Sequence, residues 1–123
     1  VSAFLLSRSS DLRYLIRETF AYKFTFQHVG LAKKNTRQQL RNFQMSLRNQ
    51  GCKRAPLPTN WLEAFDMLAG LVSQSQAKKK VVFIDEMPWM DAPKSSFLSA
   101  LEHFWNAFAS ARKDVLLIVC GSA

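Results

Sequence analysis

The sequence has few cysteines, few glycines and no long apolar run, and each shortage argues against a class of protein. Cys52 and Cys120 have no further Cys or His at metal-ligand spacing, which argues against a disulfide framework or a zinc site and favours a reduced, cytoplasmic setting. None of the four glycines is followed by lysine, so no phosphate loop ending in Gly-Lys-Ser/Thr is present. The runs Val81–Ile84 and Val115–Cys120 are far shorter than the roughly 20 residues of a membrane-spanning helix.

The bulk composition is that of an ordinary globular domain. The chain has 123 residues, of which 48% are hydrophobic and 21% charged. Such a chain is long enough for one hydrophobic core, so we expect residues 1–123 to form a single domain or part of one. The first six residues lack a positively charged leader, and we predict no signal peptide.

Positive charge is concentrated in the first half of the chain. Residues 1–60 contain eleven Lys and Arg against two acids, whereas residues 61–123 contain six against seven. Five of these cations recur at nearly helical spacing, a pattern that can follow a nucleic-acid backbone: Lys33, Lys34, Arg37, Arg41 and Arg48. A solvated helix face gives the same pattern, and no helix-turn-helix, zinc finger or aromatic RNA-binding signature accompanies it. Contact with DNA through residues 1–60 is therefore an alternative hypothesis.

The spacing of apolar residues predicts alternating strands and helices. Strands are expected at Phe4–Leu6, Tyr22–Gln27, Val81–Ile84 and Val115–Cys120. Helices are expected from Asp11 to Phe20, from Lys33 to Asn49, after an Asn60 cap with Glu63 in a capping box, and after Pro93 with Asp91 as a cap. This order favours a three-layer α/β domain, with a parallel sheet, right-handed crossovers and helices on both faces.

Several local expectations follow from the same patterns. Tyr22, Phe24 and Phe26 alternate with polar residues, which predicts one covered strand face. Lys78–Lys80 predicts a solvated start to the next strand, and Pro88 predicts that no helix begins directly after that strand. The helix after Pro93 is expected to bury one stripe of residues: Phe97, Leu98, Leu101, Phe104, Trp105 and Phe108. His28 and His103 are expected to be solvated or structurally bonded rather than catalytic.

The most informative segment is Val81–Glu86, in which four apolar residues lead into two adjacent carboxylates, Asp85 and Glu86. A continuous apolar run is typical of a parallel strand buried on both faces, and open α/β sheets bind ligands beyond the carboxyl ends of such strands. The pattern is typical of a Walker B motif, in which the first acid holds Mg²⁺ and the second acts on the attacking water. An ordinary buried strand that ends in a solvated turn would show the same residues.

Three segments of the second half together resemble the nucleotide-binding domain of prokaryotic AAA-type ATPases of the archaeal-ATPase group: Val81–Met90 (VVFIDEMPWM), Ser95–Ala111 (SSFLSALEHFWNAFASA) and Leu116–Ala123 (LLIVCGSA). Weaker similarity extends the match back to Tyr14. The resemblance implies a P-loop NTPase fold that uses ATP and Mg²⁺. It implies that Asp85 coordinates the metal, that Glu86 is the catalytic glutamate, and that Ser122 is a polar sensor near the γ-phosphate.

The segment before Tyr14 departs from this family. Where the family has a glycine-rich loop ending in Gly-Lys-Thr, the sequence reads Ser7–Arg13 without any glycine, and Leu12 and Arg13 replace the Lys and Thr. Arg8 or Arg13 could supply a positive charge to the phosphates, but neither replaces a backbone cradle. We therefore expect part of an AAA-type ATPase domain, incomplete at both ends and inactive alone. The alternative is a non-catalytic basic module that binds nucleic acid or another partner.

The resemblance leaves the biological output of such an ATPase open. Similar proteins carry further domains, some of them related to DNA binding. DNA contact through such a domain is therefore an alternative to DNA contact through residues 1–60. The sequence indicates no oligomeric state. It indicates no contact with a membrane.

Overall fold

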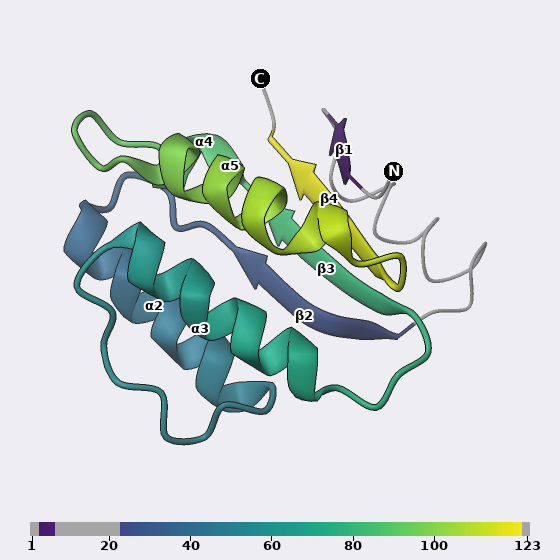
Figure 1. Cartoon of the computed structure of the whole chain (residues 1–123). Coiled ribbons are helices and arrows are strands. Elements are labelled where there is room, and N and C mark those ends of the chain that lie inside the picture. Colours follow the sequence, from purple (N-terminus) through teal and green to yellow (C-terminus); the bar gives the residue numbers. More distant parts are fainter. Residues whose placement is uncertain (1–2, 7–22, 122–123) are drawn as a thin grey trace.

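The computed structural model describes residues 3–6 and 23–121, and these form an α/β arrangement (Figure 1). Four strands build one sheet in the order β1-β4-β3-β2: β1 (Ala3–Leu6), β2 (Phe24–Val29), β3 (Lys80–Asp85) and β4 (Val115–Cys120). Every pair of neighbours in the sheet is parallel. The predicted parallel sheet is confirmed, and the carboxyl ends of all four strands lie at the same edge.

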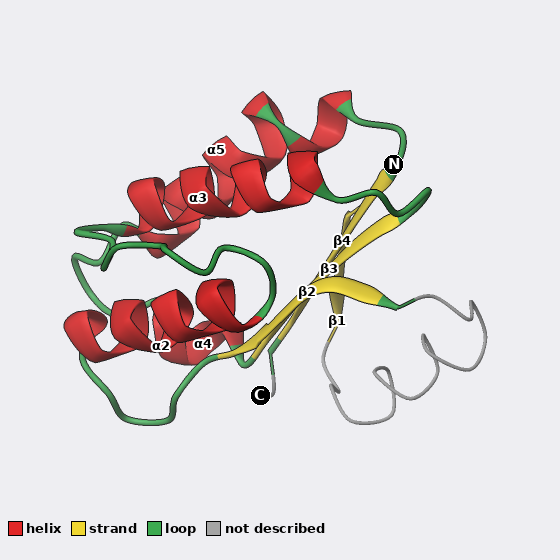
Figure 2. Cartoon of the chain, turned by 90° about the horizontal axis from the view of Figure 1, so that it is seen from below, coloured by secondary structure: helices red, strands yellow, loops and turns green. Residues whose placement is uncertain are grey.

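Three longer helices pack on one face of this sheet. Figure 2 shows this arrangement with the sheet seen nearly edge-on. They are α2 (Thr36–Asn49), α3 (Trp61–Gln74) and α5 (Phe97–Ala107), and the short elements α4 (Met87–Met90) and η1 (Ala109–Ala111) accompany them. The helix predicted from Asp11 to Phe20 lies outside the described residues, so the predicted helical layer on the second face stays a prediction. Among the residues that the structure describes, no helix is long and apolar enough to cross a membrane.

A cluster of aromatic rings fills the space between the helices and the sheet. The Phe43 ring lies 5.3 Å from that of Phe26, 5.5 Å from that of Trp61 and 5.7 Å from that of Phe65, centroid to centroid. Phe97 extends the cluster onto α5, with its ring 5.0 Å from Trp61. Large rings contribute much of the burial in a domain of this size, so this cluster fixes the helices relative to β2.

Both long helices before β3 begin at an asparagine. Asn35 caps α2 in a full capping box with Gln38, which the sequence reading had not identified. Asn60 caps α3 as predicted, since its side chain accepts a 2.8 Å bond from the Glu63 amide. The Glu63 carboxylate, however, accepts from the hydroxyl and amide of Thr59 and not from Asn60. The second capping box is therefore only half formed.

A bulge in β2 overturns the prediction that Phe24 and Phe26 share a strand face. Phe24 pairs with Val81 and Phe26 pairs with Val82. Between these two pairs β2 therefore contains one residue more than β3. Such a bulge turns the preceding side chain to the opposite face. Phe26 accordingly lies in the large core under the helices, whereas Phe24 packs with Phe83 on the other side of the sheet.

The helix predicted to begin at Pro93 with Asp91 as its cap begins later, at Phe97. Lys94 and Ser96 have φ values of 63° and 60°, in the left-handed region that interrupts a right-handed helical path. Since two of the three residues between Pro93 and Phe97 take this conformation, the helix cannot extend back to the proline. The prediction is wrong because proline's fixed φ is compatible with a first helical turn but does not ensure one.

The apolar face of α5 is also narrower than predicted. Phe97, Ala100 and Phe104 are buried, whereas Leu98 has 42% of its surface exposed. Three further predicted members only pack partly against the core: Leu101, Trp105 and Phe108. α5 therefore buries one line of side chains fully and the residues beside that line only in part.

Lys80, predicted to be part of a solvated cluster, is buried at the start of β3. Its ammonium donates to the Ala77 carbonyl at 2.8 Å and to the Asp114 carboxylate at 2.7 Å. Asp114 also accepts a hydrogen bond from Arg112. The bond from Lys80, and to a smaller extent the bond from Arg112, lowers the pKa of Asp114 from 3.8 to about 2. The ion pair joins the amino ends of β3 and β4, which explains why a lysine is tolerated there.

The outer edge of β2 is closed by side-chain amides of α2 and its C-cap. Gln50 accepts from the Gln27 amide and donates to the Gln27 carbonyl, both at 2.8 Å, as a neighbouring strand would. Asn42 donates to the Val29 carbonyl at 2.9 Å. Edge strands with unpaired backbone groups invite pairing with other chains, and these amides protect this one.

We expect Gln50→Ala to expose this edge and promote self-association. The Gln27 amide and carbonyl lose their partner, which costs about 1–3 kcal/mol of unfolding free energy and leaves a template for strand pairing. Sedimentation velocity over a range of concentrations measures the effect. Gln44→Ala is the matched control, because its amide bonds the Ala55 carbonyl and not β2. Identical sedimentation of the two variants would show that the amide does not protect the edge.

Candidate functional site

The two predicted acids lie at the carboxyl edge of the sheet. Asp85 is the last residue of β3, a strand whose six residues are all buried, and it keeps only 5% of its surface exposed. Glu86 follows in the left-handed conformation with φ 57° and ψ 40° and is half-buried. The Asp85 Oδ1 atom accepts a 2.7 Å bond from the Glu86 amide. The predicted junction between strand and turn is therefore present.

The helical turn α4 begins directly after Glu86, which contradicts the prediction that Pro88 would prevent it. Pro88 lies in the first turn of α4, where its missing N–H would have no partner within the helix anyway. The left-handed Glu86 redirects the chain so that this turn folds back over the sheet edge. We call residues 85–90, from Asp85 to Met90, the acid turn.

Two glycines leave room for the acid turn to pack against the residues that follow β2 and β4. Gly30 directly follows β2, donates its amide to the Asp85 carbonyl at 2.9 Å, and would place a Cβ atom 2.7 Å from the Glu86 carbonyl oxygen. Gly121 directly follows β4, and a Cβ atom there would lie 2.7 Å from Cδ of Pro88. Real Cβ atoms do not approach other atoms so closely, so both positions require glycine for the observed packing.

A buried glutamine ties the acid turn to the loop that follows β2. Gln39 of α2 is fully buried. Its Oε1 atom accepts from the Leu31 amide at 3.0 Å, and its Nε2 atom donates to the Leu31 carbonyl at 2.6 Å and to the Trp89 carbonyl at 3.2 Å. This residue was missed in the sequence, because one glutamine beside the apolar stripe of a polar helix gives no distinct signal.

The acid turn supplies carboxylates but no complete metal cage. Within residues 3–6 and 23–121, no group of three or more His, Cys, Asp or Glu could hold a metal ion. Mg²⁺ is usually bound by one or two carboxylates together with phosphate oxygens and water, and Asp85 with Glu86 fits that donor set. The arrangement therefore suits an ion that arrives with phosphates. The other predicted site residues, Arg8, Arg13 and Ser122, lie outside the described residues.

His28 is buried in β2 and bonded to a helix residue. Its Nδ1 atom lies 2.6 Å from Oγ of Ser46, and its ring lies 4.8 Å from that of Phe43 in an edge-on arrangement. Burial lowers the pKa of His28 from 6.5 to about 4, so the ring is neutral at pH 7. No described carboxylate orients the ring, and the pair is a structural hydrogen bond between β2 and α2, as predicted for a lone histidine.

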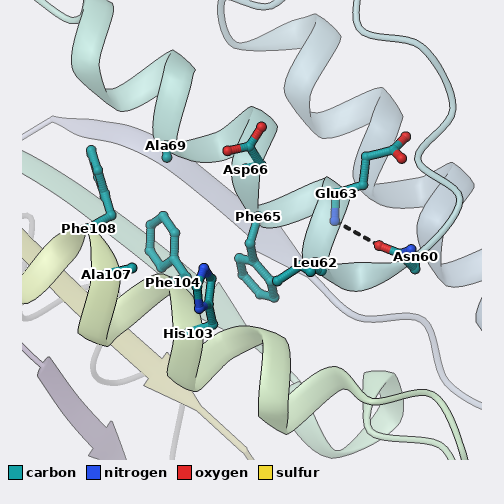
Figure 3. Close-up of a pocket in the computed structure, with 10 residues that line it drawn as sticks. All are labelled: Asn60, Leu62, Glu63, Phe65, Asp66, Ala69, His103, Phe104, Ala107 and Phe108. Atoms are coloured by element: carbon teal, nitrogen blue, oxygen red, sulfur yellow. Dashed lines mark hydrogen bonds between the residues drawn. The ribbon is translucent and has the colours of Figure 1, made fainter.

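A groove of about 600 Å³ opens between α3 and α5 on the outside of the helical layer (Figure 3). The rings of Phe65, Phe104 and Phe108 and the side chain of Leu62 make it apolar, while Asp66 stands at its rim. His103 lines it from α5, exposed and away from the buried stripe as predicted. No residue of the acid turn lines this groove, so it is a feature separate from the candidate site.

Comparison of the chain with protein-family models, with curated proteins and with solved structures gives no match.

Proposed function

We propose that the chain supplies the Walker B half of a nucleotide-binding site, in a domain of the AAA-type ATPase kind. One observation carries the proposal: a buried carboxylate, Asp85, ends a fully buried parallel strand, and a second carboxylate follows it in a turn that neighbouring elements hold. Parallel α/β sheets bind ligands beyond the carboxyl ends of their strands. The acid turn lies at that edge, with β2 on one side of β3 and β4 on the other.

Each residue of the pair would have a distinct role. Asp85 would hold Mg²⁺ that accompanies the phosphates, because its carboxylate is fixed at the strand end by the Glu86 amide. Glu86 would orient or deprotonate the attacking water, since it is more exposed than Asp85 and follows it directly beyond the strand end. The bound ion would neutralise charge on the phosphates. Ser122 follows β4 in the sequence, and we propose it as the group that senses the γ-phosphate.

The missing glycines limit what the chain does alone. Backbone amides of a glycine-rich loop provide most of the phosphate contacts in P-loop proteins, and Ser7–Arg13 contains no glycine. Arg8 and Arg13 can contribute point charges only. We therefore expect the chain to bind Mg-ATP with a Kd of about 1 mM or weaker, near −4 kcal/mol, and to turn it over undetectably.

Restoring the loop tests whether the acid turn is a working half-site. The substitutions Leu6→Gly, Asp11→Gly, Leu12→Lys and Arg13→Thr create Gly-x-x-x-x-Gly-Lys-Thr over residues 6–13. Isothermal titration with Mg-ATP is expected to show binding at about 1–100 μM in this grafted chain. A grafted chain with an unchanged circular dichroism spectrum and no Mg-ATP binding would refute the proposal.

Two further substitutions in the grafted chain separate the two roles. Asp85→Asn should weaken Mg-ATP binding by at least about tenfold, or 1.4 kcal/mol, because the carboxylate that holds the ion is lost. Glu86→Gln should preserve binding and abolish turnover, because an amide cannot accept the proton of water. If Asp85→Asn leaves Mg-ATP binding unchanged, the carboxylate does not hold the ion.

A further inference from the structure

A long row of positive charge lies along α2 and its flanking loops. Between residues 33 and 54 the chain has seven Lys and Arg and no Asp or Glu. All seven are exposed: Lys33, Lys34, Arg37, Arg41, Arg48, Lys53 and Arg54. We call these seven residues the basic ridge.

The three arginines of α2 share one side of the helix. At about 100° per residue, Arg37, Arg41 and Arg48 fall within about 40° of each other around the helix axis, and about 16 Å separate the first from the last along it. The buried residues Leu40 and Phe43 lie on the other side, against β2. The arginines therefore form one line that faces solvent.

The flanking cations extend this line at both ends of α2. Lys33 and Lys34 immediately precede the N-cap Asn35. After α2 the chain folds back alongside the helix, since the Ala55 carbonyl accepts from Arg48 Nε at 2.8 Å and from Gln44 Nε2 at 3.0 Å. Lys53 and Arg54 directly precede Ala55, so they lie beside the last turns of α2. The basic ridge thus spans the whole helix.

No described carboxylate neutralises the basic ridge. The salt bridges in the described part of the chain join Lys80 and Arg112 to Asp114, and none involves a residue of the ridge. Arg37 and Arg41 are four residues apart, where like charges disfavour a helix and an acid would stabilise it. A solvated helix face usually mixes both signs. An uncompensated row of one sign instead concentrates a positive potential that attracts polyanions.

We propose that the basic ridge binds the phosphate backbone of nucleic acid without reading its sequence. Arginine and lysine side chains position a protein on phosphates, whereas sequence is read by groups that reach the base edges. The exposed side of α2 offers cations and the apolar side chain of Met45, which is 52% exposed, and no aromatic residue. The proposal does not depend on the acid turn.

Fluorescence anisotropy with a labelled duplex of about 20 base pairs tests this inference. With six to seven phosphate contacts, affinity should fall about 10³-fold between 50 and 200 mM NaCl, and Kd near physiological salt should be about 1–100 μM. A scrambled duplex of equal length should bind equally. Absence of binding at 50 mM NaCl, or binding that salt does not weaken, would overturn the proposal.

Two variants with the same net charge locate the contact. The ridge variant carries Lys33→Gln, Lys34→Gln, Arg37→Gln and Arg41→Gln, and the control carries Lys23→Gln, Lys78→Gln, Lys94→Gln and Lys113→Gln at exposed positions elsewhere. The ridge variant should lower the salt slope by about four, one for each lost cation, and weaken binding at least 100-fold at 50 mM NaCl. Equal losses in both variants would show that net charge alone attracts DNA.

Further measurements separate this inference from the alternatives and from the proposed function. DNA binding should survive Asp85→Asn with Glu86→Gln, because the acid turn makes no contribution to it, and its loss would contradict the ridge as the site. Vesicles with phosphatidylserine serve as the competing polyanion. Binding to these vesicles at protein concentrations that leave the duplex unbound would assign the ridge to a lipid surface and overturn the proposal.

Discussion

Replacing Gly30 with alanine is expected to lower the free energy of unfolding by about 1–3 kcal/mol, the usual cost of forcing an extra methyl group into a packed region. The new Cβ atom would lie 2.7 Å from the Glu86 carbonyl oxygen and 3.1 Å from Cγ of Met90. The nearer atom belongs to the backbone and cannot rotate away. The acid turn must therefore move, and with it the conformation that sets Glu86 beyond the strand end.

Gly70→Ala is the matched control for this prediction. Gly70 lies within α3 and has no atom within 4 Å of a built Cβ, so alanine should stabilise the helix by about 0.5–1 kcal/mol. Urea denaturation measures both variants. A change in native tryptophan emission in Gly30→Ala that Gly70→Ala does not share would report displacement of Trp89 in the acid turn, because Trp61 and Trp105 are common to both variants. A Gly30→Ala chain that is as stable as Gly70→Ala would show that the turn is not held against β2.

The buried strands and the main helix faces could be predicted from the sequence because each has a regular apolar period. Val81–Ile84 and Val115–Cys120 read as strands covered on both faces, and the structure buries almost every residue in them. Leu40, Phe43 and Leu47 recur at helical spacing and are all buried in α2. Asp85 could then be placed at one edge of the sheet, because parallel strands all have their carboxyl ends at the same edge.

The features that shape the acid turn could not be predicted, because each depends on neighbours distant in sequence. The left-handed Glu86 and the early start of α4 require Gly30 and Gly121 to lie at the ends of the adjacent strands. The bond from Gln39 to Trp89 joins residues 50 positions apart. The local pattern placed Asp85 and Glu86 at the end of β3, but the packing around them is a tertiary property.

The environments of the charged residues could likewise be predicted only in part from the sequence. Lys80 belongs to a run of three lysines that reads as solvated, yet it is buried because Asp114 on the adjacent strand end neutralises it. The basic ridge also reads as a solvated face, and its exposure is confirmed. What the sequence could not show is that no described carboxylate forms a salt bridge with it. Whether a Lys or Arg side chain is buried in an ion pair or left exposed therefore depends on which carboxylates the fold places next to it.

The acid turn and the basic ridge meet at one loop. Leu31 and Lys34 belong to the connection between β2 and α2, and Gln39 bonds both of them and Trp89 of the acid turn. Lys33 and Lys34 begin the basic ridge in this same loop. The side chain of Gln39 therefore fixes the backbone of this loop against the backbone of the acid turn.

Acidification from pH 7 to pH 4 is expected to remove about 3 kcal/mol of stability through His28 alone, at 1.36 kcal/mol for each pKa unit. Burial lowers the pKa of His28 from 6.5 to about 4, because a charged ring would lose its hydration among Phe26 and Phe43. Between these pH values the unfolded chain binds the proton and the folded chain does not. Stability is therefore fully present above pH 6.5 and falls as the pH drops towards 4.

Urea denaturation at several pH values in this window measures the effect, with His28→Leu as the test variant. The variant loses the bond to Ser46, so its stability at pH 7 is not the diagnostic quantity. The slope of unfolding free energy against pH is diagnostic, and it should flatten between pH 6.5 and 4 because leucine does not titrate. Asp114 begins to titrate at about pH 5 in the unfolded chain, but it is present in both proteins, so its contribution cancels when their slopes are compared. An unchanged slope in His28→Leu would mean that another group takes up the proton, and that the ring is not neutral for the reason given.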